Sequence, residues 1–121
     1  MRSPVWSISS VILLGLAITA CNGVSEIEVI EISRQSVGFK ITTTNGTTPC
    51  LRSATLKDYT GLEVWTIQMT HENEICITDF SYPKVPRGFV LTGSQGSLKP
   101  GKYLIQTISG AYRGEETFEV V

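Results

Sequence analysis

Residues 98–109 read LKPGKYLIQTIS, and this stretch decides the fold class. Pro100-Gly101 is a turn dipeptide. The run behind it, Tyr103–Ser109, is rich in aromatic and β-branched residues, which favour strands. A glycine-containing turn separates it from a final run at Glu116–Val121. The end of the chain therefore predicts a turn followed by a hairpin of two strands.

The rest of the chain shows the same strand pattern. Trp65, Ile67 and Met69 fall on one face of an alternating run. Ile30 and Ile32 break the alternation that precedes them, which indicates a bulge or a strand buried on both faces. The remaining expected strands are 26–29, 37–43, 52–57, 62–70, 75–82 and 89–92, with turns at 45–46, 58–61 and 71–74.

These seven or eight short strands predict an all-β domain. No helical period is present outside the first twenty residues. Such spacing is typical of a β-sandwich or a small barrel, and frequent turns favour antiparallel neighbours.

The run Leu98-x-Pro100-Gly101-x-Tyr103-x-Ile105 resembles the tyrosine corner of immunoglobulin-like and fibronectin-like domains. The ending Phe118-Glu119-Val120 is similar to their last strand. The resemblance implies an antiparallel immunoglobulin-like β-sandwich in which the Tyr103 hydroxyl bonds to backbone near Leu98–Pro100. Ile105 stands where antibody-type domains have a cysteine, so their inter-sheet disulfide is missing. The alternative is an ordinary Pro-Gly turn before a strand.

Composition limits the class of function. The 121 residues carry 10 basic and 11 acidic side chains and a net charge of −1. This length fits one domain, and the balanced charge predicts no nucleic-acid partner.

Residues 1–20 read MRSPVWSISSVILLGLAITA and are predicted to be a signal peptide. Arg2 supplies a positive start, and the apolar stretch is densest at Val11–Ile18. That core is shorter than the roughly 20 apolar residues of a membrane-spanning helix.

The next four residues, Ile18-Thr19-Ala20-Cys21, resemble the bacterial lipobox. The resemblance implies a lipoprotein in which Cys21 is diacylated, becomes the first mature residue and is usually N-acylated, with palmitate-type chains. Two or three chains anchor a protein stably, whereas one chain binds marginally. An uncleaved membrane anchor or an unmodified Cys21 are the alternatives.

The predicted division is a signal peptide at 1–20, a lipidated cysteine and tether at 21–25, and a β-sandwich at 26–121. Asn22–Ser25 would span at most about 14 Å, so we expect the domain to lie close to the membrane. Gram-negative lipoproteins held in the inner membrane carry Asp where this chain has Asn22. The sequence thus favours the cell envelope, at the outer membrane facing the periplasm in a Gram-negative host. In a Gram-positive host this last argument does not apply.

Two cysteines remain, Cys50 and Cys76, and an exported chain permits a disulfide between them. A flat meander of 51–57, 62–70 and 75–82 would place them two strands apart, about 9.6 Å. A disulfide needs Cα atoms within about 7 Å. We therefore expect either a bond in loops at one end or a segment that crosses to another sheet.

Residues 81–114 contain five basic side chains and no acidic one, whereas 22–80 hold eight acids and four bases. This asymmetry predicts a patch for an anionic surface such as lipid phosphates, anionic lipid or an acidic protein. Ordinary solvated charges that protect strand edges are the alternative. The five residues are Lys84, Arg87, Lys99, Lys102 and Arg113.

No residue pattern predicts catalysis, a metal site or a cofactor. His71, Glu72 and Glu74 fall in one expected turn, where adjacent side chains point in different directions. No serine lies in a nucleophile motif.

Three functions follow from this sequence. The first is a non-enzymatic, lipid-anchored binding or structural domain with an envelope protein as its partner. The second is a periplasmic inhibitor or accessory subunit that uses the proline-rigidified loop Pro83–Gly88. The third is a lipid-carrying small barrel, which needs an open apolar interior.

Overall fold

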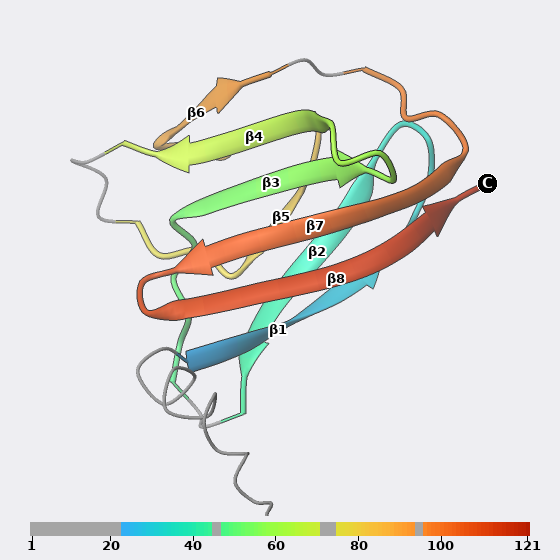
Figure 1. Ribbon diagram of the computed structural model, residues 1–121. Coiled ribbons are helices and arrows are strands. Elements are labelled where there is room, and N and C mark those ends of the chain that lie inside the picture. The colour runs from blue at the N-terminus through green and yellow to red at the C-terminus, as the bar shows by residue number, and fades with distance from the viewer. Residues whose placement is uncertain (1–22, 45–46, 71–74, 94–95) are drawn as a thin grey trace, which may run out of the picture.

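The computed structural model describes residues 23–44, 47–70, 75–93 and 96–121, which form an all-β domain of eight strands (Figure 1). The predicted strand number is confirmed. Within the described residues, no helix has the length and apolar character needed to cross a membrane. The strands are β1 Gly23–Ile30, β2 Val37–Thr43, β3 Ser53–Asp58, β4 Glu63–Met69, β5 Asp79–Tyr82, β6 Phe89–Thr92, β7 Gly101–Ser109 and β8 Tyr112–Val120.

The strands form one sheet in the order β5-β2-β1-β8-β7-β3-β4-β6. All neighbours are antiparallel except β1 and β8, so the prediction of a purely antiparallel fold is wrong at this pair. Parallel neighbours need a long crossover connection, and here the connection is the whole chain between the first and last strands. Counting turns along the sequence gives no information about such a distant pair.

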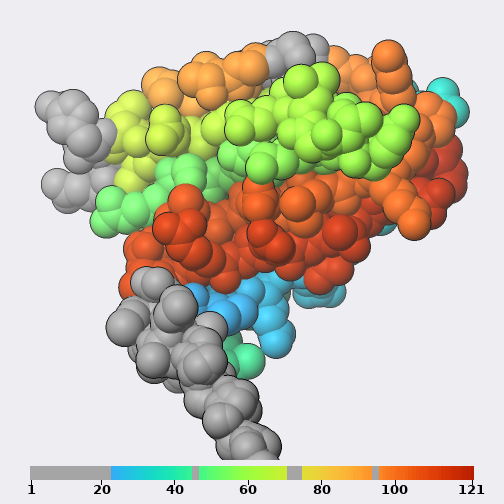
Figure 2. Space-filling view, viewed as in Figure 1, coloured from blue at the N-terminus to red at the C-terminus, as the bar shows by residue number. Residues whose placement is uncertain are grey.

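Strand β1 joins the two halves of the sheet. It pairs with β8 at Gly23↔Tyr112 and Val24↔Arg113, and with β2 from Ser25 to Ile30. The outer faces of β3, β4, β7 and β8 form one continuous surface in Figure 2.

The sheet curls until strands from its opposite ends touch. Trp65 of β4 stacks on Phe80 of β5 with ring centroids 6.5 Å apart, although β5 is an edge strand at the far end of the order. Phe39 of β2 packs edge-on against Phe118 of β8 at 5.8 Å. The curled sheet thus encloses packed aromatic side chains where a lipid-carrying barrel would need an open apolar interior.

Period-two alternation explains which residues enter this core. In β2, Val37, Phe39 and Ile41 are buried, whereas Lys40 and Thr42 are exposed. Successive side chains of a strand point to opposite faces, so one register buries a complete apolar set. The expected common face of β4 is confirmed, because Trp65 and Ile67 are buried and the partly buried Met69 packs against the same core.

The expected strand at 75–82 is confirmed only for its second half. Ile77 O accepts a bond from Leu51 N at 3.0 Å, whereas Thr78 O accepts one from Ile41 N at 2.9 Å. Residues 75–78 therefore bond to two different segments and follow no single partner strand. Regular pairing begins at Asp79.

Ile30 and Ile32 mark neither a bulge nor a doubly buried strand, so that expectation is wrong. Both side chains are partly exposed, and β1 ends at Ile30. Glu31 adopts a positive φ of 53°, which turns the chain out of the extended conformation. The break in alternation at Ile30 and Ile32 therefore reflects a turn at Glu31.

Strand β1 begins at Gly23, three residues before the expected domain boundary. Residues 23–25, expected to belong to a tether, are part of the sheet. Only Asn22 then separates Cys21 from the first strand.

Segment 83–88 runs between the two edge strands, β5 and β6. Val85 packs against the core. Gly88 O accepts a bond from Thr70 N at 2.9 Å. The segment expected to be an inhibitory loop therefore closes the open side of the curled sheet.

The hydrogen bond predicted for the Tyr103 hydroxyl is present. The Tyr103 hydroxyl donates to Lys99 O at 2.8 Å, inside the predicted stretch Leu98–Pro100. This prediction is confirmed.

Candidate functional site

The domain has two ends. The proximal end holds the start of β1, the β7–β8 turn at 110–111 and the segments that carry Cys50 and Cys76. The distal end holds the β3–β4 turn at 59–62, loop 31–36, residues 96–100 and the C-terminus. In Figure 1 the proximal end is on the left and the distal end on the right.

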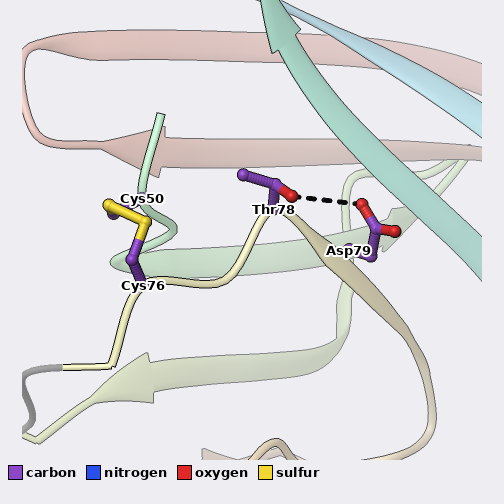
Figure 3. The surroundings of a disulfide bond; sticks show 4 residues. All are labelled: Cys50, Cys76, Thr78 and Asp79. Atoms are coloured by element: carbon purple, nitrogen blue, oxygen red, sulfur yellow. Dashed lines mark hydrogen bonds between the residues drawn. A yellow bond between two sulfur atoms is a disulfide. The ribbon is translucent and has the colours of Figure 1, made fainter. Parts of the chain in front are cut away.

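The predicted disulfide is present at the proximal end (Figure 3). The Cα atoms of Cys50 and Cys76 are 4.7 Å apart. The first of the two expectations holds, because both cysteines lie outside strands at this end, while β5 pairs with β2 of the same sheet and not with β4. The bond thereby ties the segment before β3 to the segment before β5.

The five basic residues of 81–114 do not form one patch. Lys102 lies near the start of β7, whereas Arg113 pairs with Ile108 near its end. Six residue steps along a strand correspond to about 20 Å. Lys99 precedes β7 at the distal end, and Arg87 adjoins Gly88, whose carbonyl is bonded at the proximal end. Lys84 follows β5, whose last residue lies at the distal end beside Gly96.

At the proximal end, Arg113 belongs to a different group, which we call the proximal row. The row contains Val24, Arg113 and Ile108, which are successive neighbours across β1, β8 and β7. Val24 is 64% exposed and Ile108 37% exposed. Arg52 adjoins the row, because its backbone N–H donates to Ile108 O at 2.8 Å.

At the distal end a cavity of about 310 Å³ lies beside the β3–β4 turn, and we call it the distal groove. Tyr59 at its rim is 81% exposed. The lining surface is mainly apolar, and Lys57 and Lys102 contribute to it. The lining residues are Lys57, Asp58, Tyr59, Gly61, Lys102, Tyr103, Leu104 and Thr117.

Asp58 holds the turn that presents Tyr59. Its Oδ1 accepts bonds from the Thr60 hydroxyl and from the backbone N–H groups of Thr60 and Leu62, the latter two at 2.9 and 3.1 Å. The Thr60 hydroxyl bond is the main reason that the pKa of Asp58 lies below its ordinary value. The ionised Asp58 carboxylate therefore fixes the backbone of the turn that carries Tyr59.

Two buried tyrosines fix the neighbouring distal loop. Tyr103 donates to Lys99 O, and Tyr82 both donates to Gly96 O and accepts from Gly96 N at 3.0 Å. Burial raises the pKa of Tyr103, so its hydroxyl keeps the proton that it donates.

Sequence reasoning singled out Lys102 and Arg113 but missed Tyr59, Lys57, Val24 and Arg52. Tyr59 lies within the expected turn DYTG, and an aromatic residue in a turn was the available signal. No local signal identifies Val24 and Arg52, because they meet Arg113 and Ile108 only through strand pairing and loop hydrogen bonds.

Some predicted residues lie outside the described ones. These are Cys21, the turn at 45–46, and His71, Glu72 and Glu74. Among the described residues, no three His, Cys, Asp or Glu side chains come close enough together to hold a metal ion.

Comparison of the chain with models of protein families, with curated proteins and with solved structures found no match.

Proposed function

We propose that this chain is a lipid-anchored protein of the cell envelope whose immunoglobulin-like β-sandwich binds an envelope partner without catalysis. In a Gram-negative host it lies at the outer membrane and faces the periplasm. The motif Ile18-Thr19-Ala20-Cys21 supports the anchor.

Three features support the immunoglobulin-like sandwich. Strand β1 divides its pairing between β2 and β8, which separates the sheet into two halves. Aromatic side chains of the halves meet in the interior, as Trp65 and Phe80 do. Tyr103 makes the backbone bond of a tyrosine corner.

The observation that carries the binding function is the distal groove. The nine residues of β7 span about 30 Å between the two ends of the domain. An anchor at Cys21 holds the proximal end at the bilayer, so the groove faces away from it. Exposed tyrosine is a frequent anchor residue in protein interfaces, because it buries a large apolar ring and keeps a polar hydroxyl.

Mass spectrometry of the mature N-terminus tests the anchor. We expect an acylated Cys21 as the first residue, and we expect Cys21→Ser to abolish acylation. A mature chain without acyl mass would overturn the lipoprotein proposal.

Site-specific photo-crosslinking in the native envelope tests the binding surface. A photoreactive residue at position 59 should give a defined protein adduct. The matched control is position 90, because Val90 is also exposed but lies on edge strand β6. Tyr59→Ala combined with a crosslinker at position 62 should lose the adduct. Equal adducts from positions 59 and 90 would contradict a specific distal site.

A further inference from the structure

We infer that the proximal row and Arg52 form a seat for the anionic phosphate layer of the bilayer that holds the chain's own acyl groups. This inference rests on the lipid anchor of the proposed function. It names a second binding surface, at the opposite end from the distal groove.

The seat alternates apolar and cationic side chains. Val24 lies beside Arg113, Arg113 beside Ile108, and Ile108 bonds to the backbone of Arg52. All four are at least partly exposed. Among the described residues, neither guanidinium takes part in a hydrogen bond or an ion pair. Two guanidinium groups are therefore free to bind a ligand.

The side chains fit a phospholipid surface. A guanidinium binds phosphate oxygens through two parallel N–H bonds, which an ammonium group cannot do. Branched apolar side chains between such groups enter the boundary between headgroups and acyl chains. An interfacial surface of this kind combines apolar area with attraction to anionic lipid.

The position of the anchor indicates that the seat binds the bilayer that holds the acyl groups. In the mature chain of the proposed lipoprotein, Cys21 and Asn22 precede β1, and two extended residues reach at most about 7 Å. Val24 is the second residue of that strand. A short tether raises the effective concentration of the second contact to the millimolar range or above. A weak affinity of the seat for phosphate is therefore sufficient to orient the domain.

Acidic residues also occur near this end. Glu26 and Glu115 lie two positions further along the strands from Val24 and Arg113, and Glu115 accepts a bond from Gln106 Nε2 at 2.7 Å. Glu72 and Glu74 belong to a segment outside the described residues. The test therefore measures contact with the membrane directly and does not infer it from net charge.

The experiment places a fluorescent dye at one end or the other of the lipidated mature protein. Because Cys50 and Cys76 are paired and Cys21 is acylated, one added cysteine is the single reactive thiol. Ile108→Cys reports on the seat, and Leu62→Cys, at a position 63% exposed, reports on the distal end. The protein is reconstituted into vesicles of phosphatidylcholine alone or mixed with phosphatidylglycerol, each with quencher-bearing lipid.

In the mixed vesicles we expect at least twofold stronger quenching at position 108 than at position 62. Arg52→Glu with Arg113→Glu should remove this difference. Lys84→Glu with Lys99→Glu, an equal charge change at exposed distal residues outside the groove, should leave it intact. Unchanged denaturation midpoints show that each variant is folded.

Equal quenching at the two positions, or an arginine variant that behaves like the parent, would overturn the seat while leaving an acylated Cys21 and the proposed function in place. A missing acyl mass would overturn the proposed function and the seat together.

Discussion

Different interactions stabilise the proximal end and the distal end of this domain. At the proximal end a covalent bond joins Cys50 to Cys76, and β1 crosses from one half of the sheet to the other. At the distal end the turn and loop depend on hydrogen bonds from Asp58, Tyr82 and Tyr103. Each hydrogen bond contributes about 1 kcal/mol, whereas a disulfide contributes several. The stronger constraint thus lies at the end of the domain where β1 begins.

Removal of the disulfide should have the largest effect. Cys50→Ala with Cys76→Ala should lower the free energy of unfolding by about 3–4 kcal/mol, because a bond between residues 26 apart restricts the unfolded chain. Urea denaturation under oxidising conditions measures the loss. Reduction of the parent protein should reproduce it. A loss below about 1 kcal/mol would show that the proximal end does not depend on the covalent bond.

Gly114→Ala tests the junction of β1 with β8. A Cβ atom at position 114 would lie 2.6 Å from Ser25 Oγ and 2.9 Å from Thr107 Oγ1. Overpacking of this kind costs about 1–3 kcal/mol. Thermal or urea denaturation measures the loss.

Ser25→Ala is the matched control for this junction. The Ser25 hydroxyl is buried and has no hydrogen-bond partner among the described residues, so its removal alone should cost little. Combined with Gly114→Ala, it should recover part of the lost stability. If the double variant is no more stable than Gly114→Ala alone, the contact with Ser25 Oγ is not the cause of the lost stability.

Tyr103→Phe should produce a smaller loss at the distal end. The substitution removes the bond to Lys99 O and should cost about 1 kcal/mol or somewhat more. Tyr82→Phe should cost more, because the Tyr82 hydroxyl makes two bonds to Gly96. Denaturation midpoints rank the two variants. An unchanged midpoint for Tyr103→Phe would indicate that the corner bond does not stabilise the distal loop.

The smallest effect should follow from Asp58→Asn and should depend on pH. The pKa of Asp58 is lower in the folded protein than in the unfolded chain, so its stabilisation is complete above the unfolded pKa. It disappears as the pH falls through the folded pKa. Asp58→Asn should therefore be slightly less stable than the parent at neutral pH, and the two should converge in acid. A constant difference between their urea midpoints at all pH values would contradict the role of the charge.

Local pattern was sufficient to predict most strands. Val37, Phe39 and Ile41 alternate with polar or small residues, and this register has only one face to bury. The pattern was insufficient at 75–78, because Ile77 and Thr78 bond to different segments. Short apolar runs carry no information about which partner they will find.

The all-β class, the turn within 58–61, the pairing of Cys50 with Cys76 and the backbone bond of Tyr103 could be predicted from the sequence alone. Each of these depends on neighbouring residues or on elimination. The folded structure was needed to find three other features. These are the parallel pairing of β1 with β8, the separation of Lys102 from Arg113, and the approach of Arg52 to Ile108. These contacts join residues far apart in the chain, and their register is set by the burial of the shared core.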